Sequence, residues 1–141
     1  MEINQLITVN HEVFSAFEKL LSQLSDNIKL TKENLSEVIN SKDTYIFVAE
    51  EDGEIIGILT LITYLIPSGR KSWIEDVVVN NNIRGKGIGR KLVQHAIDHA
   101  SAMGITKIDL TSSFERVATN ELYQKMGFKK RDTNVYRLEI N

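Results

Sequence analysis

The sequence predicts an α/β or α+β fold built around a mixed β-sheet. A strand, a long helix and another strand follow one another over residues 72–111, which is typical of a parallel crossover connection. Asp52-Gly53 lies between two apolar runs and indicates a tight antiparallel hairpin beside that unit. The predicted order is β-α-α-β-β-β-α-β-α-β. Since no linker or repeat interrupts it, residues 1–141 are expected to form a single domain.

Residues 3–9 predict the first strand, and two amphipathic helices follow it. Thr31 is a suitable N-cap for the second of these helices. The hairpin comes next, with strands expected at residues 45–50 and 54–65. In each helix, apolar residues recur at helical spacing. They are Val13, Phe14, Phe17, Leu20, Leu21 and Leu24 in the first helix and Leu35, Val38 and Ile39 in the second.

A loop at residues 67–69 leads into a strand at residues 72–79, whose Trp, Ile and Val content favours β-structure. Asn80-Asn81-Asn82 ends that strand, and a glycine-rich turn opens the long helix, which Gly104 is placed to end. One apolar stripe along this helix is formed by Ile88, Leu92, Val93, Ala96, Ile97, Ala100 and Met103.

The C-terminal part begins with a strand at residues 106–111, which the crossover places beside the strand at 72–79. A helix at residues 115–126 follows and ends at Gly127. Residues 134–140 alternate between apolar and polar side chains, which predicts a final strand.

Composition excludes several classes of protein. The sequence has no cysteine, so disulfides, thiolate metal sites and a covalent cysteine mechanism are excluded. Lys and Arg total 17 against 19 Asp and Glu, which argues against a nucleic-acid partner. No signal peptide is recognisable, and the apolar stretch at 55–66 is too short for a bilayer, which takes about 20 residues. A soluble cytoplasmic protein without a membrane partner is expected.

The turn before the long helix carries the clearest chemical signal. Glycines alternate along Arg84-Gly85-Lys86-Gly87-Ile88-Gly89-Arg90-Lys91, and they let a ligand approach the backbone without interference from a Cβ. The free N–H groups at a helix start favour an anion, and four cationic side chains surround this turn. In physical terms the turn is a pyrophosphate site.

Two common phosphate-binding motifs do not fit this turn. The Walker A pattern, Gly-x-x-x-x-Gly-Lys-Ser/Thr, does not occur in the sequence. The dinucleotide pattern Gly-x-Gly-x-x-Gly fails because Arg90 or Leu92 stands where the third glycine is required. The turn does match Arg/Gln-x-x-Gly-x-Gly/Ala, through Arg84, Gly87 and Gly89.

At this point the sequence resembles the GNAT (GCN5-related N-acetyltransferase) superfamily, over about residues 72–130. The resemblance includes residues 74–79 before the turn and residues 120–128 after it, where Leu122-Tyr123 and Gly127-Phe128 match Leu-Tyr-x-x-x-Gly-Phe. It implies a mixed, mostly antiparallel central sheet flanked by helices, with a strand–helix–strand unit that binds coenzyme A. The implied reaction transfers the acetyl group of acetyl-CoA to a primary amine by direct attack. The acceptor would be a small-molecule or peptide amine, and a homodimer is among the expected assemblies.

The resemblance also implies roles for individual residues. Tyr123 matches the general acid for the coenzyme A thiolate, and a phenol suits this role because its pKa of about 10 lies near that of an alkyl thiolate. Backbone groups near Val78 would pair with the pantetheine arm and polarise the thioester. The residues expected to bind the coenzyme are Val77, Val78, Val79, Arg84, Gly85, Lys86, Gly87, Ile88, Gly89, Arg90, Ser112, Asn120 and Tyr123.

Other assignments stay open at the level of sequence. Glu75 is the expected general base, with Asp76, on the opposite strand face by alternation, and Asp109 as alternatives. Many relatives have an asparagine where this sequence has Arg116, and either Asn120 or the hydroxyls at residues 111–113 are candidates to replace it.

The remaining expectations concern metals, the acceptor and rival functions. His95 and His99 are expected on the solvated face of the long helix, and no metal site is predicted. The basic loop at residues 67–71 suits an anionic amine such as an amino sugar phosphate, or is simply solvated. The rival functions are a non-catalytic acyl-CoA-binding regulatory module and a nucleotide-phosphate enzyme of another class.

Overall fold

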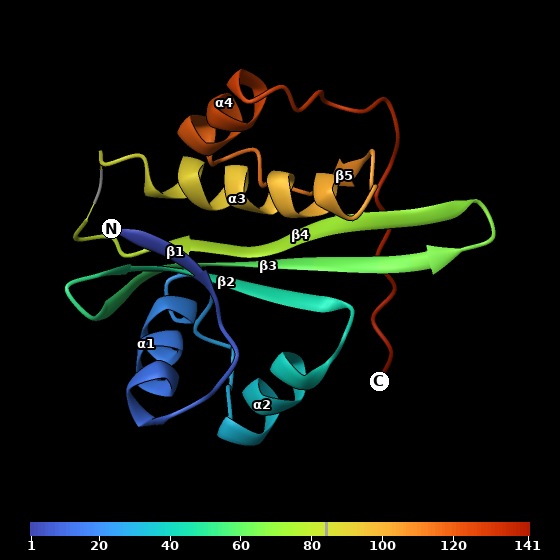
Figure 1. Ribbon diagram of the computed structural model, residues 1–141. Coiled ribbons are helices and arrows are strands. Elements are labelled where there is room, and N and C mark those ends of the chain that lie inside the picture. The colour runs from blue at the N-terminus through green and yellow to red at the C-terminus, as the bar shows by residue number, and fades with distance from the viewer. Residues whose placement is uncertain (84) are drawn as a thin grey trace. The chain divides into compact units, whose positions relative to one another are not determined.

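The computed structural model describes residues 1–83 and 85–141, and the chain divides into two compact units, Met1–Leu110 and Thr111–Asn141. Whether residues 1–141 act as a single domain stays a prediction. The second unit holds α4 (Val117–Lys125) (Figure 1). The first unit holds β1 (Glu2–Gln5), α1 (His11–Leu21), α2 (Lys32–Asn40), β2 (Thr44–Glu51), β3 (Glu54–Ile66), β4 (Gly69–Val79), α3 (Ile88–Ala102) and β5 (Ile108–Asp109).

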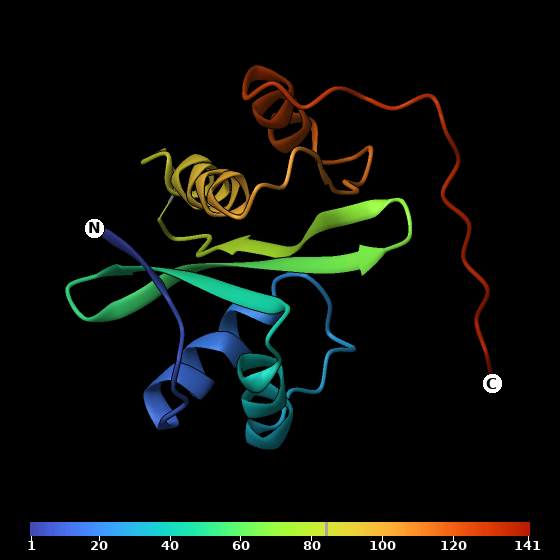
Figure 2. The ribbon, with the colours of Figure 1, turned by 45° about the vertical axis from the view of Figure 1, so that its right-hand side comes forward.

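The strands of the first unit form one sheet in the order β1-β2-β3-β4-β5. Neighbouring strands are antiparallel except β4 and β5, which are parallel. Helices α1 and α2 cover one face of this sheet and α3 covers the other (Figures 1 and 2). The predicted mixed, mostly antiparallel sheet and the crossover from β4 through α3 to β5 are confirmed.

Local sequence explains where several elements begin and end. Asp52 and Gly53 have φ values of 52° and 78°, which the tight turn between β2 and β3 requires. Thr31 caps α2 as predicted, because its hydroxyl accepts a hydrogen bond of 3.0 Å from the backbone N–H of Asn34. Gly104 follows α3 with a φ of 80°, a left-handed conformation that suits a helix end.

Apolar layers flank both faces of the sheet. Helix α3 buries most of its predicted stripe, with Ile97 and Met103 only partly buried, and Gly57 on β3 permits the close approach of the helix. A Cβ at Gly57 would lie 3.1 Å from Cδ1 of Leu92 and 3.2 Å from Cγ2 of Ile88. The buried layer under α1 and α2 consists of Leu6, Phe17, Leu20, Leu21, Leu35, Ile46, Val48, Ile58 and Val78.

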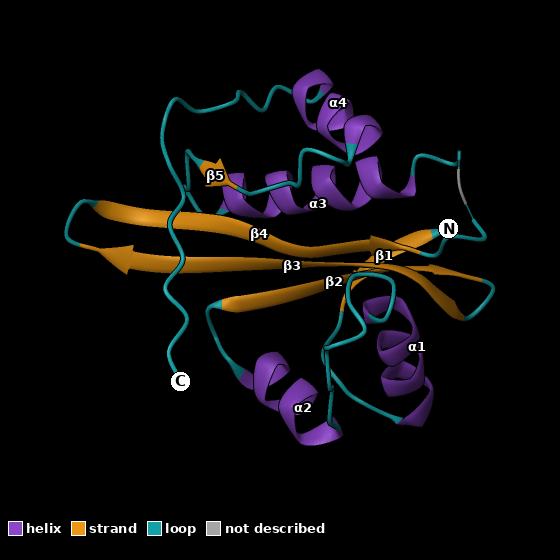
Figure 3. Ribbon diagram, turned by 180° about the vertical axis from the view of Figure 1, so that it is seen from behind, coloured by secondary structure: helices purple, strands orange, loops and turns teal. Residues whose placement is uncertain are grey.

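The predicted final strand at residues 134–140 is wrong. The segment after α4 runs to the C-terminus as a loop (Figure 3), and its apolar side chains Val135, Tyr136, Leu138 and Ile140 are exposed. Alternation produces a strand only where a neighbouring strand takes up the backbone hydrogen bonds. Among the described residues, no strand pairs with this segment.

Other predicted boundaries shift by a few residues. Strand β1 ends at Gln5 instead of Val9, and β5 is confined to Ile108–Asp109. Arg70 and Lys71 belong to β4, so the expected basic loop is reduced to a tight turn at residues 67–68. In the part of the chain that the structure describes, no helix has the length and apolar character needed to cross a membrane.

Candidate functional site

The turn between β4 and α3 leaves the first N–H groups of α3 unoccupied by side chains. Gly87 is the N-cap of α3 and makes no side-chain cap hydrogen bond, and the first turn of the helix contains no acidic residue. Gly85 and Gly87 have φ values of 80° and 68°, which glycine adopts without strain. An uncapped helix start with its positive dipole end is a suitable site for an anion.

Three of the four cations expected around this turn are exposed. Lys86 lies 3.8 Å from the carboxylate of Glu51, and 61% of its side chain is accessible, so this ion pair contributes little to stability. Arg90 and Lys91 are exposed as well. Arg84 lies outside the described residues. The cations at 86, 90 and 91 are therefore free to meet a ligand in solution.

The side-chain amide of Gln23 fastens the start of this turn. Its Nε2 donates a hydrogen bond of 3.0 Å to the carbonyl oxygen of Val79, and its Oε1 accepts one of 3.1 Å from the N–H of Asn81. Gln23 follows α1, and it lies 56 residues before Val79 and 58 residues before Asn81 in the sequence. No local pattern in the sequence indicates this contact, so it could not be predicted from the sequence.

Strand β4 has an open edge beside this turn. It pairs with β5 only at Ser72 and Trp73, so within the described chain the edge from Ile74 to Val79 that faces away from β3 has no strand partner. Val78 is 4% exposed, and its side chain packs in the layer under α1 and α2. The side chain of Val78 therefore packs in the core, while this edge of β4 remains open to an extended ligand.

A β-bulge interrupts β4 at Asp76. Thr60 of β3 pairs with Glu75 and Ile58 pairs with Val78, so two residues of β4 lie opposite Leu59. Asp76 has a φ of 51°, a left-handed conformation that Asp tolerates better than most residues. The bulge contradicts the prediction that Glu75 shares a face with Val77 and Val79, because the register places Glu75 and Val78 on the same face of β4.

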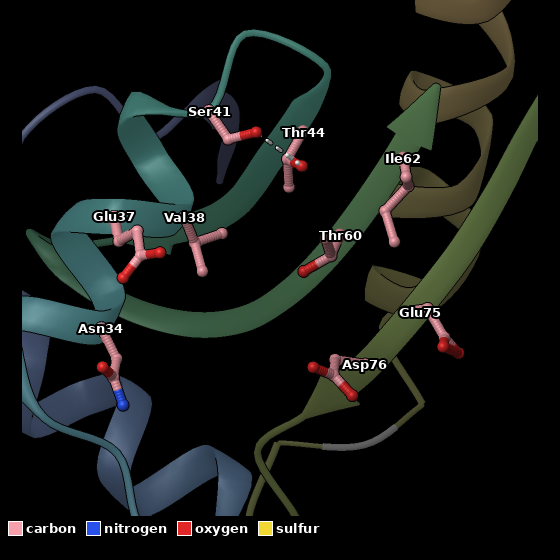
Figure 4. Close-up of a pocket in the computed structure, with 9 residues that line it drawn as sticks. All are labelled: Asn34, Glu37, Val38, Ser41, Thr44, Thr60, Ile62, Glu75 and Asp76. Carbon is pink, nitrogen blue, oxygen red and sulfur yellow. Dashed lines mark hydrogen bonds between the residues drawn. The ribbon is translucent and has the colours of Figure 1, made fainter. Parts of the chain in front are cut away.

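That pocket has a volume of about 600 Å³ and lies between α2 and β4 (Figure 4). Asp76 and Glu37 extend into the space from opposite sides. Burial raises the pKa of Asp76 although part of its side chain still meets solvent. The lining residues are Asn34, Glu37, Val38, Ser41, Thr44, Thr60, Ile62, Glu75 and Asp76. Asp109, the third candidate base, is not among them.

In the second unit, Tyr123 is buried within the predicted helix motif. Its side chain is 8% exposed, and its ring centroid lies 5.6 Å from that of Phe128. Gly127 has a φ of 102°, and the N–H of Phe128 donates to the carbonyl oxygen of Tyr123 at 3.0 Å, which closes the helix end. Burial raises the pKa of the Tyr123 phenol, and Arg116 opposes this shift.

Two other residues expected to bind the coenzyme also lie in this unit. Asn120 donates its side-chain amide to the carbonyl oxygen of Ser113 at 2.9 Å, so it holds the segment before α4. The hydroxyl oxygen of Ser112 is buried and has no hydrogen-bond partner. A buried hydroxyl without a partner is costly, which makes Ser112 available for a ligand.

The two histidines of α3 do not lie on a solvated face, and that expectation is wrong. His95 packs edge-on against Phe47 with ring centroids 4.6 Å apart, and His99 lies 4.5 Å from Tyr45. The pKa of His99 is lowered, mainly because the ring is partly buried and also because the positive charge of His95 is nearby. In residues 1–83 and 85–141, no group of three or more His, Cys, Asp or Glu side chains is placed to hold a metal ion.

Known proteins match this chain over most of its length. Residues 10–128 match the acetyltransferase (GNAT) family. The sequence is 34% identical over 125 residues to glucosamine 6-phosphate N-acetyltransferase from Arabidopsis thaliana, across 82% of each protein. It is 30% identical over 125 residues to glucosamine 6-phosphate N-acetyltransferase 1 from Dictyostelium discoideum, across 82% of this chain and 77% of that protein.

The fold agrees with the sequence matches. The crystal structure of glucosamine-6-phosphate N-acetyltransferase from Arabidopsis thaliana superposes with a TM-score of 0.79 at 26% identity, over 98% of this chain and 99% of that chain. The family match also spans the β4–α3 turn and the Tyr123 motif, the two segments that carry the resemblance. The chain is an acetyltransferase and belongs to the GNAT family.

Proposed function

We propose that this enzyme transfers the acetyl group of acetyl-CoA to a primary amine by direct attack. The observation that carries this proposal is the uncapped start of α3 directly after the open edge of β4. A pyrophosphate fits the free N–H groups between Gly87 and Arg90. An extended pantetheine arm fits the edge of β4 at Val77, Val78 and Val79 that has no strand partner. The residues present are therefore suited to coenzyme A.

The chain's own groups then divide the remaining tasks. Acetyl-CoA supplies an activated acyl thioester for the amine to attack. A backbone N–H of Val78 or Val79 donates to the thioester oxygen, where negative charge develops. Glu75 or Asp76 takes a proton from the acceptor ammonium, directly or through water. Because burial raises the pKa of Asp76, this carboxylate is a stronger base than an ordinary aspartate.

Tyr123 supplies a proton to the departing thiolate in this scheme. Burial keeps the phenol protonated, because it raises the pKa of the hydroxyl. Ser112 offers its unpartnered hydroxyl to the coenzyme, and Asn120 orders the segment that carries Ser112. A proton donor, a base and an oxyanion donor are the groups that acyl transfer to an amine requires.

An acetyl-CoA consumption screen across amine classes, with the products identified by mass spectrometry, tests this function. Glucosamine 6-phosphate belongs in the panel because the relatives from Arabidopsis and Dictyostelium are named for it. Acetylation of at least one amine supports the proposal. Tight binding of acetyl-CoA without transfer to any amine would favour a non-catalytic acyl-CoA-binding module.

Calorimetry with CoA, dephospho-CoA, ATP and NAD tests the ligand of the glycine turn. We expect CoA to bind more tightly than ATP or NAD, and the reverse order would contradict the assignment. A cytoplasmic location and a homodimer also stay predictions, which cell fractionation and light scattering would check.

A further inference from the structure

The pocket between α2 and β4 carries charge of one sign. Glu37, Glu75 and Asp76 line it, and none of its lining residues is Lys, Arg or His. Within the part of the chain that the structure describes, no hydrogen bond or ion pair reaches these three side chains, and the ion pair that does form joins Lys86 to Glu51. A cleft lined by one sign of charge concentrates ions of the opposite sign.

The carboxylates are separated by a wall that is partly apolar. Glu37 comes from α2 and Asp76 comes from the bulge in β4, and Val38 and Ile62 are among the other residues that line the pocket (Figure 4). The volume of about 600 Å³ is that of a small-molecule site and far exceeds the space that a single ammonium needs. The cavity is therefore an observation separate from the charge, and both indicate a ligand with cationic ends and an aliphatic middle.

The basic residues near this pocket are not placed to hold an anion in it. Arg70 and Lys71 pair with Leu65 and Tyr64 near the tip of the β3–β4 hairpin and are absent from the lining. At about 3.3 Å per residue, Lys71 lies roughly 13 Å along the strand from Glu75. The start of α2, another potential anion site, is capped by its own Thr31. A phosphate in this pocket would meet carboxylates in place of its usual cationic partners.

We propose that the acceptor is a primary amine with a second positive charge several methylenes away, such as an aliphatic diamine or polyamine. This inference rests on the proposed acetyltransferase function and names its substrate class. Asp76 holds the reacting amine, and Glu37 holds the distant ammonium. The new carbon–nitrogen bond forms as the acyl carbon–sulfur bond breaks. The reacting ammonium first loses one proton to a carboxylate of β4, and the nitrogen loses a second proton as the amide forms, which balances the proton that Tyr123 gives to the departing thiolate.

Steady-state kinetics with 1,4-diaminobutane, spermidine, n-butylamine, glucosamine and glucosamine 6-phosphate tests this assignment. We expect the higher of the kcat/KM values for 1,4-diaminobutane and spermidine to exceed that for glucosamine 6-phosphate by about tenfold or more. The kcat/KM for n-butylamine should lie between these two values. Glu37→Gln is expected to raise KM for the diamine about tenfold with little change in kcat, because it removes a charge-assisted hydrogen bond from the non-reacting end. The KM for n-butylamine should change little.

Glu33→Gln is the matched control, since Glu33 lies one turn earlier on α2 and outside the pocket. This variant should leave the diamine KM unchanged. Faster transfer to glucosamine 6-phosphate than to the polyamines, or an unchanged diamine KM in Glu37→Gln, overturns the charge assignment and leaves the acetyltransferase function intact. If acetyl-CoA binds but no amine is acetylated, the proposed function fails and this inference fails with it.

Discussion

The Tyr123 side chain is buried, and its ring packs edge-on against the Phe128 ring. Desolvation disfavours the phenolate, so the hydroxyl keeps its proton at neutral pH even though Arg116 partly offsets the shift in pKa. A group that remains protonated in the resting enzyme is available as an acid when a thiolate departs. This feature belongs to a single residue, and one substitution tests it.

Tyr123→Phe is predicted to lower kcat by about a hundredfold or more, the usual contribution of a positioned acid, with little change in the Kd of acetyl-CoA. The ring and its packing against Phe128 are retained, so folding should be unaffected. Stopped-flow turnover and calorimetry give the two quantities. Tyr136→Phe, on a side chain that is 88% exposed, is the control and should retain wild-type turnover. Wild-type kcat in Tyr123→Phe would remove the phenol from the mechanism.

His99 is predicted to make stability depend on pH. Its pKa in the folded state lies below the ordinary value of 6.5, so the unfolded chain binds more protons just below that pH. Stability therefore falls as the pH drops below about 6.5 and levels off below the lowered pKa. Thermal midpoints at about pH 5 and pH 7.5 measure the effect. His99→Phe keeps an aromatic ring beside Tyr45 and should show a smaller difference between the two midpoints, whereas an equal difference contradicts the prediction.

At the scale of elements, the β4–α3 turn depends on a residue outside it. Gln23 bonds Val79 and Asn81 with one side chain and so fixes the turn whose N–H groups face the expected pyrophosphate. Gln23→Ala is predicted to raise the Kd of CoA by up to about thirtyfold, because the two lost hydrogen bonds are together worth about 2 kcal/mol. Calorimetry measures the Kd. Gln124→Ala, on exposed α4 surface, should bind CoA as the wild type does. Unchanged affinity in Gln23→Ala would show that the turn holds its shape alone.

The packing of α3 on β3 depends on Gly57. Gly57→Val is predicted to lower the free energy of unfolding by about 1–3 kcal/mol, because the new side chain overlaps the positions of Leu92 and Ile88. Urea denaturation measures the loss. Gly57→Ala should cost less, since its single Cβ meets movable side-chain ends at 3.1 Å and 3.2 Å. Equal stability of Gly57→Val and the wild type would mean that α3 shifts freely on the sheet.

For the molecule as a whole, the sequence predicts the features that depend on neighbouring residues. The Asp52-Gly53 turn, the Thr31 cap and the left-handed Gly104 and Gly127 are all confirmed, because each is a short-range conformational preference. The order of elements and the crossover follow from apolar periodicity. The glycine turn also lies where it was predicted, between β4 and α3.

The features that sequence alone does not predict join distant parts of the chain. Gln23 finds its partners 56 and 58 residues away, and the rings of His95 and His99 are covered by aromatic residues of β2. The acidic pocket forms only when α2 and β4 come together. At residues 134–140 the sequence predicts a strand that the structure lacks, because an alternating pattern does not supply a partner strand.

The extra residue in β4 also limits how this gene can vary. Before it, Ile74 pairs with Leu61, and after it Val78 pairs with Ile58, whose side chain lies on the α1 side of the sheet. A codon deleted at Asp76 would leave a single β4 residue opposite Leu59, so the bulge would be lost while Val78 stays opposite Ile58. A codon deleted at Trp73, where the pairing is regular, would instead turn the side chains on one side of the deletion to the opposite face. We therefore expect single-codon deletions to be tolerated at the 67–68 turn, to remove the bulge without preventing folding at 76, and to disrupt folding at 73, which a scanning deletion library would reveal.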